Sequence, residues 1–127
     1  MAIQGEFETV TASDPVNRYR YFLNVVIDTS EVWVCRTAKG HLYTFRSDGR
    51  EVIPLFARPV FVERWVRRAS DVVATAALLD EFVEHELTEE SHPNALVAVM
   101  PVGEDTGYLV DLDRFCRDIR MELDLIT

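Results

Sequence analysis

The amino-acid sequence predicts a single layered α+β domain, in which an antiparallel sheet of about five strands is covered by about four helices. Three observations support this class. Apolar residues recur with helical spacing near both ends, at residues 16–27 and 112–123. Strand-like segments separated by glycine turns fill residues 31–55. No repeat or Pro/Gly/Ser-rich linker interrupts the chain of 127 residues. We expect an N-terminal arm at residues 1–12 and one domain over residues 13–127.

The first helix is predicted to begin at Ser13-Asp14-Pro15, because a capping side chain is followed by proline at the first helical position. Its apolar residues form one stripe: Val16, Tyr19, Leu23, Val26 and Ile27. A helix with one apolar stripe packs against a flat surface.

A three-stranded antiparallel meander is predicted next, since three segments rich in β-branched and aromatic residues are joined by Lys39-Gly40 and Asp48-Gly49 turns. The segments are Glu31–Thr37, His41–Arg46 and Glu51–Leu55. The first is apolar on both faces and should lie inside the sheet. Pro54 has no N–H to donate, which puts the end of the third strand at an edge.

The second half should add helices and two more strands. A helix is expected around Phe61–Ala69 and another over Leu78–Leu87, whereas Asp71–Ala77 fits either a short strand or the start of a helix. Ala95–Met100 reads as a buried central strand, and Tyr108–Val110 as a short one. Asp111 is a plausible N-cap for a last helix with one apolar stripe: Leu112, Phe115, Cys116, Ile119 and Leu123.

Several segments together resemble the bacterial family of domains of unknown function numbered 2750. They are Arg18–Phe22, Glu31–Trp33, Gly49–Pro54, Phe61–Trp65, Leu78–Phe82 and Leu96–Met100, which span roughly residues 16–115. Phe56 and Ala57 stand where that family usually has tryptophan and proline. The resemblance implies a compact α+β fold with one antiparallel sheet, and it assigns no activity or catalytic residue. Immunity proteins that neutralise toxins include small acidic bacterial domains with a similar look, which is an analogy at the level of fold and charge.

Charge narrows the classes of partner. The chain carries 22 acidic and 13 basic residues, a net charge of −9, with +2 on residues 1–68 and −11 on residues 69–127. A nucleic-acid backbone would be repelled by this field, so we expect a protein partner, with a basic surface as the best match. No apolar run is long enough for a bilayer and the first residues do not read as a secretory signal, which predicts a cytoplasmic protein without a membrane partner.

Two sets of charged residues are candidate binding sites. The acidic, partner-binding set is Glu81, Glu84, Glu89, Glu90, Glu104 and Asp105. The basic set, which could contact an anion but more simply pairs with carboxylates, is Arg58, Arg64, Arg67 and Arg68.

No linear catalytic motif is present, and we expect no cofactor, no metal and no catalytic residue. Glu81, His85 and Glu89 share a helical spacing suited to a metal, yet an ordinary solvated helix face explains them better. Cys35 and Cys116 fall on apolar positions typical of reduced core cysteines rather than nucleophiles.

Three functions therefore stay open, led by a non-enzymatic interaction domain with an immunity or antitoxin-like role as its most concrete form. The second is a small enzyme or ligand-binding domain whose site between sheet and helices joins residues far apart in sequence: His41, Arg50, Glu51 and Tyr108. The third is a structural homodimer that meets through Ala95–Met100 or through the edge near Pro54. Large aromatic residues could serve the core or an interface: Trp33, Tyr43, Phe45, Phe56 and Trp65.

Overall fold

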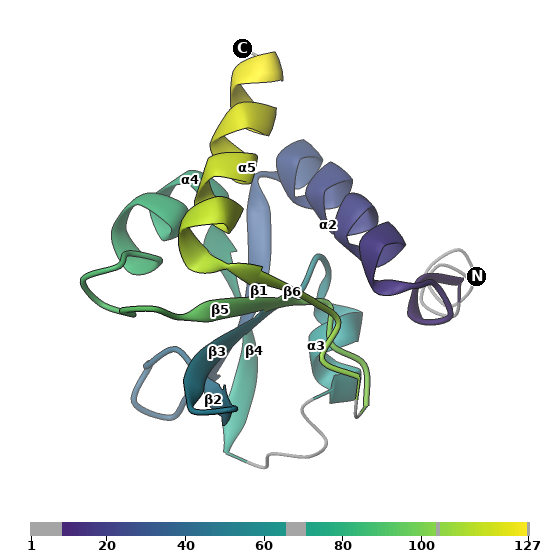
Figure 1. The fold of residues 1–127 in the computed structure, drawn as a ribbon. Helices are drawn as coiled ribbons and strands as arrows, with labels where there is room; N and C mark the ends of the chain where they lie inside the picture. The colour runs from purple at the N-terminus through teal and green to yellow at the C-terminus, as the bar shows by residue number, and fades with distance from the viewer. Residues whose placement is uncertain (1–8, 66–70, 104, 127) are drawn as a thin grey trace.

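The computed structural model describes residues 9–65, 71–103 and 105–126, and it confirms the α+β class (Figure 1). The helices are α2 (Pro15–Thr29), α3 (Pro59–Trp65), α4 (Leu79–Glu81), the π-helical turn η2 (Phe82–Glu86) and α5 (Leu112–Ile126). The strands are β1 (Glu31–Thr37), β2 (Phe45–Ser47), β3 (Arg50–Leu55), β4 (Val72–Leu78), β5 (Leu96–Val99) and β6 (Tyr108–Asp111). No helix among these residues is both long and apolar enough to cross a bilayer.

Helix α2 begins where the sequence predicts. Asp14 caps it by accepting a hydrogen bond from the Asn17 N–H at 2.9 Å, and Pro15 occupies the first turn. The buried face holds Tyr19, Phe22 and Val26, but Val16 is 51% exposed, contrary to the predicted stripe. The predicted stripe also omits Phe22, which is fully buried, so the face of α2 that meets the core lies partly beside the stripe.

The strands form two sheets rather than one antiparallel meander. One sheet pairs β1 with β4 in antiparallel orientation; the other has the order β2-β3-β5-β6, in which β3 and β5 run parallel. The predicted second strand is split, because Leu42 bridges to Arg36 of β1 whereas Phe45 begins the pairing of β2 with β3. Strand β1 is therefore flanked on both edges, as its apolar faces predict.

The surroundings of Pro54 and of β5 correct two further expectations. Pro54 is aligned with Ala98 of β5 on one side, and on the other side the β2 pairing ends at Val52, so no ladder bond is lost there. That side is unpaired at Pro54 itself, but Phe56, two residues later, bridges to Trp33 of β1. Strand β5 lies between β3 and β6, so both of its edges are already paired. A second copy could not pair with β5 by strand addition.

The segment that the sequence left ambiguous is a strand, since β4 spans the full length of β1 from Glu31↔Leu78 to Thr37↔Val72. The following helix is shorter than predicted, and Leu78 is 54% exposed at the end of β4 rather than inside that helix. Pairing with β1 overrides the helical propensity of the alanine-rich stretch.

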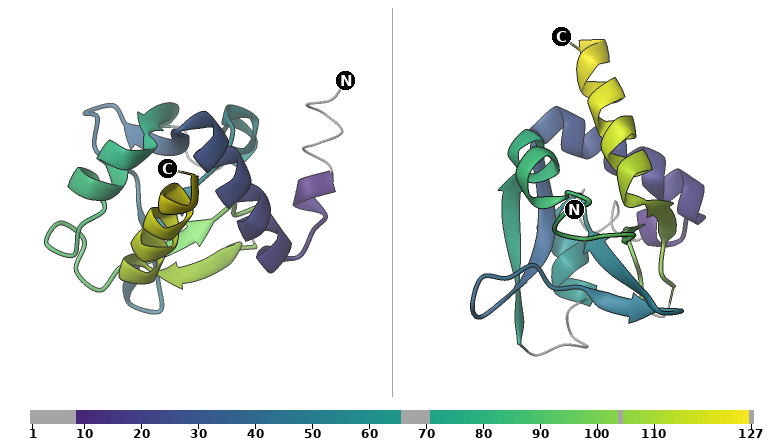
Figure 2. Two further views of the ribbon diagram at one scale, coloured as in Figure 1. Left: turned by 90° about the horizontal axis from the view of Figure 1, so that it is seen from above. Right: turned by 60° about the vertical axis from the view of Figure 1, so that its left-hand side comes forward.

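The core lies between the strands and the helices. Seen from above, η2, α5 and α2 lie next to one another over the strands, and α3 packs against β1 and β4 lower down (Figure 2). Phe22 of α2 meets Phe115 of α5 with ring centroids 5.9 Å apart. Residues 9–11 are helical and Val10 is 6% exposed, so the described end of the predicted arm contributes to the core.

Candidate functional site

An open groove of about 390 Å³ lies between η2 and α5. Its apolar lining consists of Val83, Leu87, Leu112 and Cys116, and its polar lining includes Glu84, Thr88, Glu89, Asp113, Arg117 and Arg120. The π-helical turn helps to shape this groove. The Leu87 N–H donates to the Phe82 carbonyl, and the Leu87 carbonyl accepts from the Cys116 Sγ at 3.6 Å.

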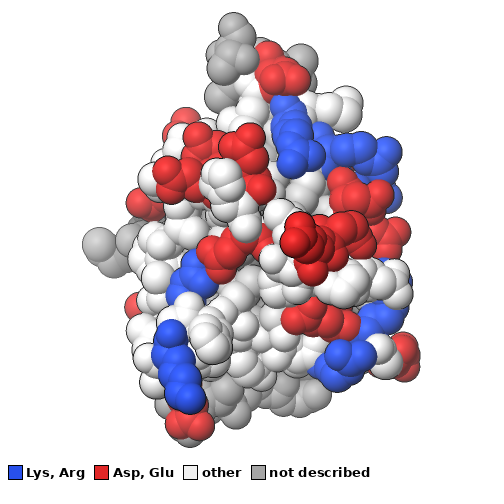
Figure 3. Space-filling model, turned by 90° about the vertical axis from the view of Figure 1, so that its left-hand side faces the viewer, with Lys and Arg blue, Asp and Glu red and all other residues white. Residues whose placement is uncertain are grey.

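The η2 side of the groove carries free negative charge. Glu84 and Glu90 are exposed and make no hydrogen bond or ion pair with another described residue, while Glu89 Oε1 accepts from the Asn94 N–H at 2.9 Å. Residues 69–113 contain eleven acidic residues and no lysine or arginine. Figure 3, which faces η2 and the loop after it, shows acidic side chains spread over this surface.

The α5 side of the groove is basic, a feature that sequence reasoning missed. All three basic residues of 69–127, Arg114, Arg117 and Arg120, lie on α5, and Arg117 and Arg120 line the groove. Their spacing of three residues is a signal that could have found them, because such residues share a helix face. Apart from Asp113 in the first turn of α5, the groove is thus bipolar, with carboxylates on the η2 wall and guanidinium groups on the α5 wall.

The structure does not gather all six predicted acidic residues. Glu84 and Glu89 line the groove, and Glu90 follows directly, but Glu81 lines a separate depression with Arg36 and His85 beside β4. Because Glu81 and His85 lie in one depression and Glu89 in another, the helical spacing that links them in sequence does not make one site. No three candidate ligands among the described residues are placed to hold a metal ion. Glu104 lies outside those residues.

Asp105 is occupied by an internal partner. The buried guanidinium of Arg18 donates to Asp105 Oδ2 at 2.5 Å, to the Met100 carbonyl at 3.0 Å and to the Ser13 carbonyl at 3.1 Å. The hydrogen bond from Arg18, followed by that from the Gly107 N–H, lowers the pKa of Asp105. Asp105 is therefore not one of the free carboxylates. Arg18 is the only buried charged side chain in the described part of the chain.

Both cysteines are buried and unpaired. Burial raises the pKa of the Cys35 thiol to about 12, and burial also raises the pKa of the Cys116 thiol. A raised pKa keeps a thiol protonated and poorly nucleophilic at neutral pH. Cys116 contributes sulfur to the groove as a small apolar surface, which agrees with its expected role as a reduced core residue.

The residues of the enzyme hypothesis do not converge. Arg50 pairs with Asp111 at 3.0 Å, and Glu51 Oε1 lies 3.0 Å from the Nδ1 of His92. His41 is exposed beyond the β1 turn, where its N–H donates to Thr37.

Tyr108, the fourth of those residues, stacks on Tyr19 of α2 with centroids 4.5 Å apart. The Tyr19 hydroxyl donates to Asp118 of α5 at 2.6 Å. Burial, followed by this hydrogen bond, raises the pKa of the Tyr19 hydroxyl. Arg114 lies 3.9 Å from the same carboxylate. This cluster ties α2 to α5 and β6.

The candidate anion-binding arginines are engaged or outside the described residues. The Nε of Arg58 donates to the Tyr21 hydroxyl at 3.2 Å, and Arg64 lines a small pocket beside Trp65. Arg67 and Arg68 lie outside the described residues.

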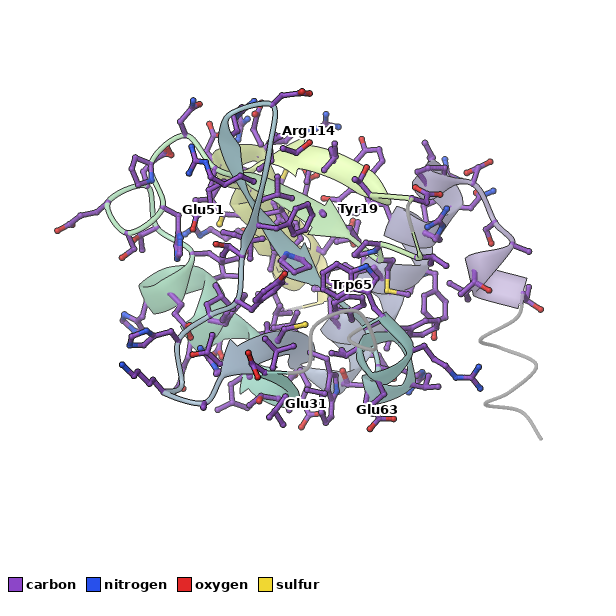
Figure 4. All side chains as sticks on the ribbon, turned by 90° about the horizontal axis from the view of Figure 1, so that it is seen from below. Tyr19, Glu31, Glu51, Glu63, Trp65 and Arg114 are labelled. Carbon is purple, nitrogen blue, oxygen red and sulfur yellow. The ribbon has the colours of Figure 1, made fainter. Side chains whose placement is uncertain are left out.

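The large aromatic residues mostly form one cluster around Trp65, the residue labelled in Figure 4. The Trp65 ring centroid lies 5.6–6.1 Å from those of Tyr43, Phe45 and Phe56. Phe56 is fully buried, and Trp33, which bridges to its backbone, is half-buried. These aromatic side chains stabilise the junction of the two sheets.

Fold and groove together define a small α+β domain with an open, bipolar groove between two helical segments. The chain belongs to the family of proteins of unknown function DUF2750, whose family model matches residues 19–119. No curated protein matches the sequence.

Proposed function

We propose that the protein is a non-enzymatic interaction domain, and that the groove between η2 and α5 docks a basic segment of another protein. The observation that carries this proposal is the free charge of Glu84, which lines the groove together with the apolar residues Val83 and Leu87, and of Glu90, which follows the lining residue Glu89. Some other carboxylates are engaged by arginines, as in Arg36–Glu86 at 2.6 Å and Arg50–Asp111 at 3.0 Å. Charge that has no internal partner is available to an external one.

The lining of the groove favours an occupant that is both apolar and charged. An apolar side chain would cover Leu87 and Cys116, and lysine or arginine residues beside it would reach Glu84 and Glu89. An acidic residue on the other side of the same segment would meet Arg117 or Arg120. Opposite charges on the two walls fix the orientation of the segment, which favours specificity over affinity.

The most concrete form of this function is an immunity or antitoxin-like role. A basic nuclease binds the phosphates of its substrate through the same lysines and arginines that a carboxylate surface would attract. Long-range attraction speeds encounter with such a target, and occupation of its basic residues opposes nucleic-acid binding.

A pull-down from native lysate tests the proposal with two variants of equal charge. Glu84→Gln/Glu89→Gln/Glu90→Gln alters the groove, and Asp28→Asn/Glu31→Gln/Glu63→Gln alters exposed carboxylates elsewhere. Figure 4 shows Glu31 and Glu63 at the opposite margin from Arg114 of α5. Glutamine at position 89 keeps the acceptor for Asn94.

We expect wild type and the control triple variant to retain the same basic protein at low salt and to lose most of it at high salt, because exposed charges are screened. The groove variant should bind it about tenfold or more weakly, as expected when three charge contacts are removed. Equal binding by both variants would contradict the proposed groove.

A further inference from the structure

One edge of strand β4 is unpaired within the described part of the chain. The other edge pairs with β1, and no other strand of the described residues pairs with β4; in the second view of Figure 2 it runs along the outer margin. Its seven residues, Val-Val-Ala-Thr-Ala-Ala-Leu, include no charge, proline or glycine. Val73 is 62% exposed and Leu78 is 54% exposed. Edge strands are normally protected against pairing with another chain by charged residues, proline or β-bulges. An edge without such protection can pair with an added strand.

The sequence of this strand is close to symmetric about Thr75. In an antiparallel pair of two copies related by a two-fold axis at Thr75, Val72 lies opposite Leu78, Val73 opposite Ala77, and Ala74 opposite Ala76. Every pair is apolar except Thr75 with itself, and threonine pairs are favourable across strands. A two-fold interface requires a patch that complements itself. We propose that β4 pairs with β4 of a second copy of this chain in this register.

In the same arrangement, each end of the β4 pair would bring Lys39 between two acidic residues, Asp71 of its own copy and Glu81 of the second copy. Lys39, the single lysine of the chain, lines a depression with Asp71 and Val73, whereas Glu81 lines the depression at Leu78. Val73 of one copy lies opposite Ala77 of the other, so Lys39 comes near Glu81 of the second copy. The two-fold axis produces this pairing twice.

Pairing would also complete an incomplete sheet. The β1–β4 ladder is two-stranded, and such a sheet gains stability when further strands extend it; the dimer would have the order β1-β4-β4-β1. One seven-residue strand from each copy makes a small interface, below the roughly 1,000 Å² of stable complexes. The dimer should therefore be weak, with a dissociation constant on the order of tens of micromolar, and it should assemble at high concentration.

Sedimentation velocity between about 5 and 500 µM gives the first readout, and we expect the mean mass to rise from monomer to dimer over this range. Thr75→Cys should then form an intermolecular disulfide on mild oxidation, because residue 75 lies opposite its own copy at about 5 Å. Val73→Cys is the matched control. Its two copies would be four residues apart along the strand, about 13 Å, and should not crosslink. The native cysteines are buried and give no background.

Charge reversal tests the register independently. Lys39→Glu and Glu81→Lys should each weaken the affinity of the dimer several-fold, and the double variant should restore it. Thr75→Lys should weaken this affinity about tenfold or more, because it places two ammonium groups face to face. Urea unfolding of each monomer shows whether the fold is intact. A wild-type protein that stays monomeric at 500 µM, or equal crosslinking through positions 73 and 75, would overturn the proposal.

Discussion

Replacing Arg18 by methionine should destabilise the domain strongly. The methionine fills the space of the arginine stem but removes three hydrogen bonds, to Ser13, Met100 and Asp105. The Arg18 side chain is 3% exposed, so its loss leaves the Met100 carbonyl without a donor in a place that water reaches poorly. Asp105 is 46% exposed and would be rehydrated.

The magnitude follows from these three contacts. An orphaned buried carbonyl costs about 1–3 kcal/mol, and a lost hydrogen bond to a charged donor costs about 1.5–3 kcal/mol when buried. Rehydration of Asp105 and solvent access at Ser13 reduce their shares, so we expect the free energy of unfolding to fall by about 3 kcal/mol. Urea titration at pH 7, followed by the fluorescence of Trp33 and Trp65, measures this change. A loss below about 1 kcal/mol would refute the assigned role of Arg18.

The same contact predicts a pH dependence. The folded-state pKa of Asp105 lies below its unfolded value near 3.9, so folding favours the ionised carboxylate. This stabilisation is complete above about pH 5 and is lost as the pH falls through the unfolded value toward the lower folded-state pKa. The difference in unfolding free energy between wild type and Arg18→Met should therefore shrink below about pH 4. A difference that is constant from pH 7 to pH 3 would contradict the ionic contact.

Three further predictions concern separate parts of the fold. Gly107→Ala should lower the free energy of unfolding in urea by about 3 kcal/mol, because φ is +74° and the added Cβ would lie 2.3 Å from a β5 carbonyl oxygen. Gly103→Ala is the control: the site has φ +57° but open space, so the loss should be only about 1 kcal/mol. Tyr19→Phe should lower the unfolding free energy by about 1–2 kcal/mol by leaving Asp118 without its donor, and an unchanged urea midpoint would contradict this contact. The raised pKa of the Cys35 thiol predicts negligible reaction with a thiol reagent at pH 8 until urea unfolds the chain; rapid labelling of the native protein would contradict its burial.

Elements with strong local signals could be predicted from the sequence. The cap at Asp14 marks the start of α2, and the stripe from Leu112 to Ile119 is buried on α5 as its period indicates. The apolar run Ala95–Met100 is a central strand, because a strand buried on both faces needs no polar alternation. These signals are local properties of the chain, which is why they could be interpreted without a fold.

Strand partners were beyond sequence reasoning. Glycine turns predict that neighbouring strands pair in a meander, yet β1 takes β4 as one partner and β3 pairs in parallel with β5. Both pairings join segments more than thirty residues apart and are decided by side-chain packing on the two faces. The burial of Arg18 has the same origin, because its acceptors at Met100 and Asp105 are brought to it only by the folded chain.

The sequence by itself determined the α+β class, the family, the positions of most helices and strands, and the acidity of the second half of the chain. The tertiary structure alone decided which charges remain free. It engaged Asp105 with Arg18, separated Glu81 from Glu84 and Glu89, and placed Arg117 and Arg120 across the groove. The physical reason is that class and periodicity arise from neighbours along the chain, whereas a binding surface depends on which side chains meet in space and neutralise one another.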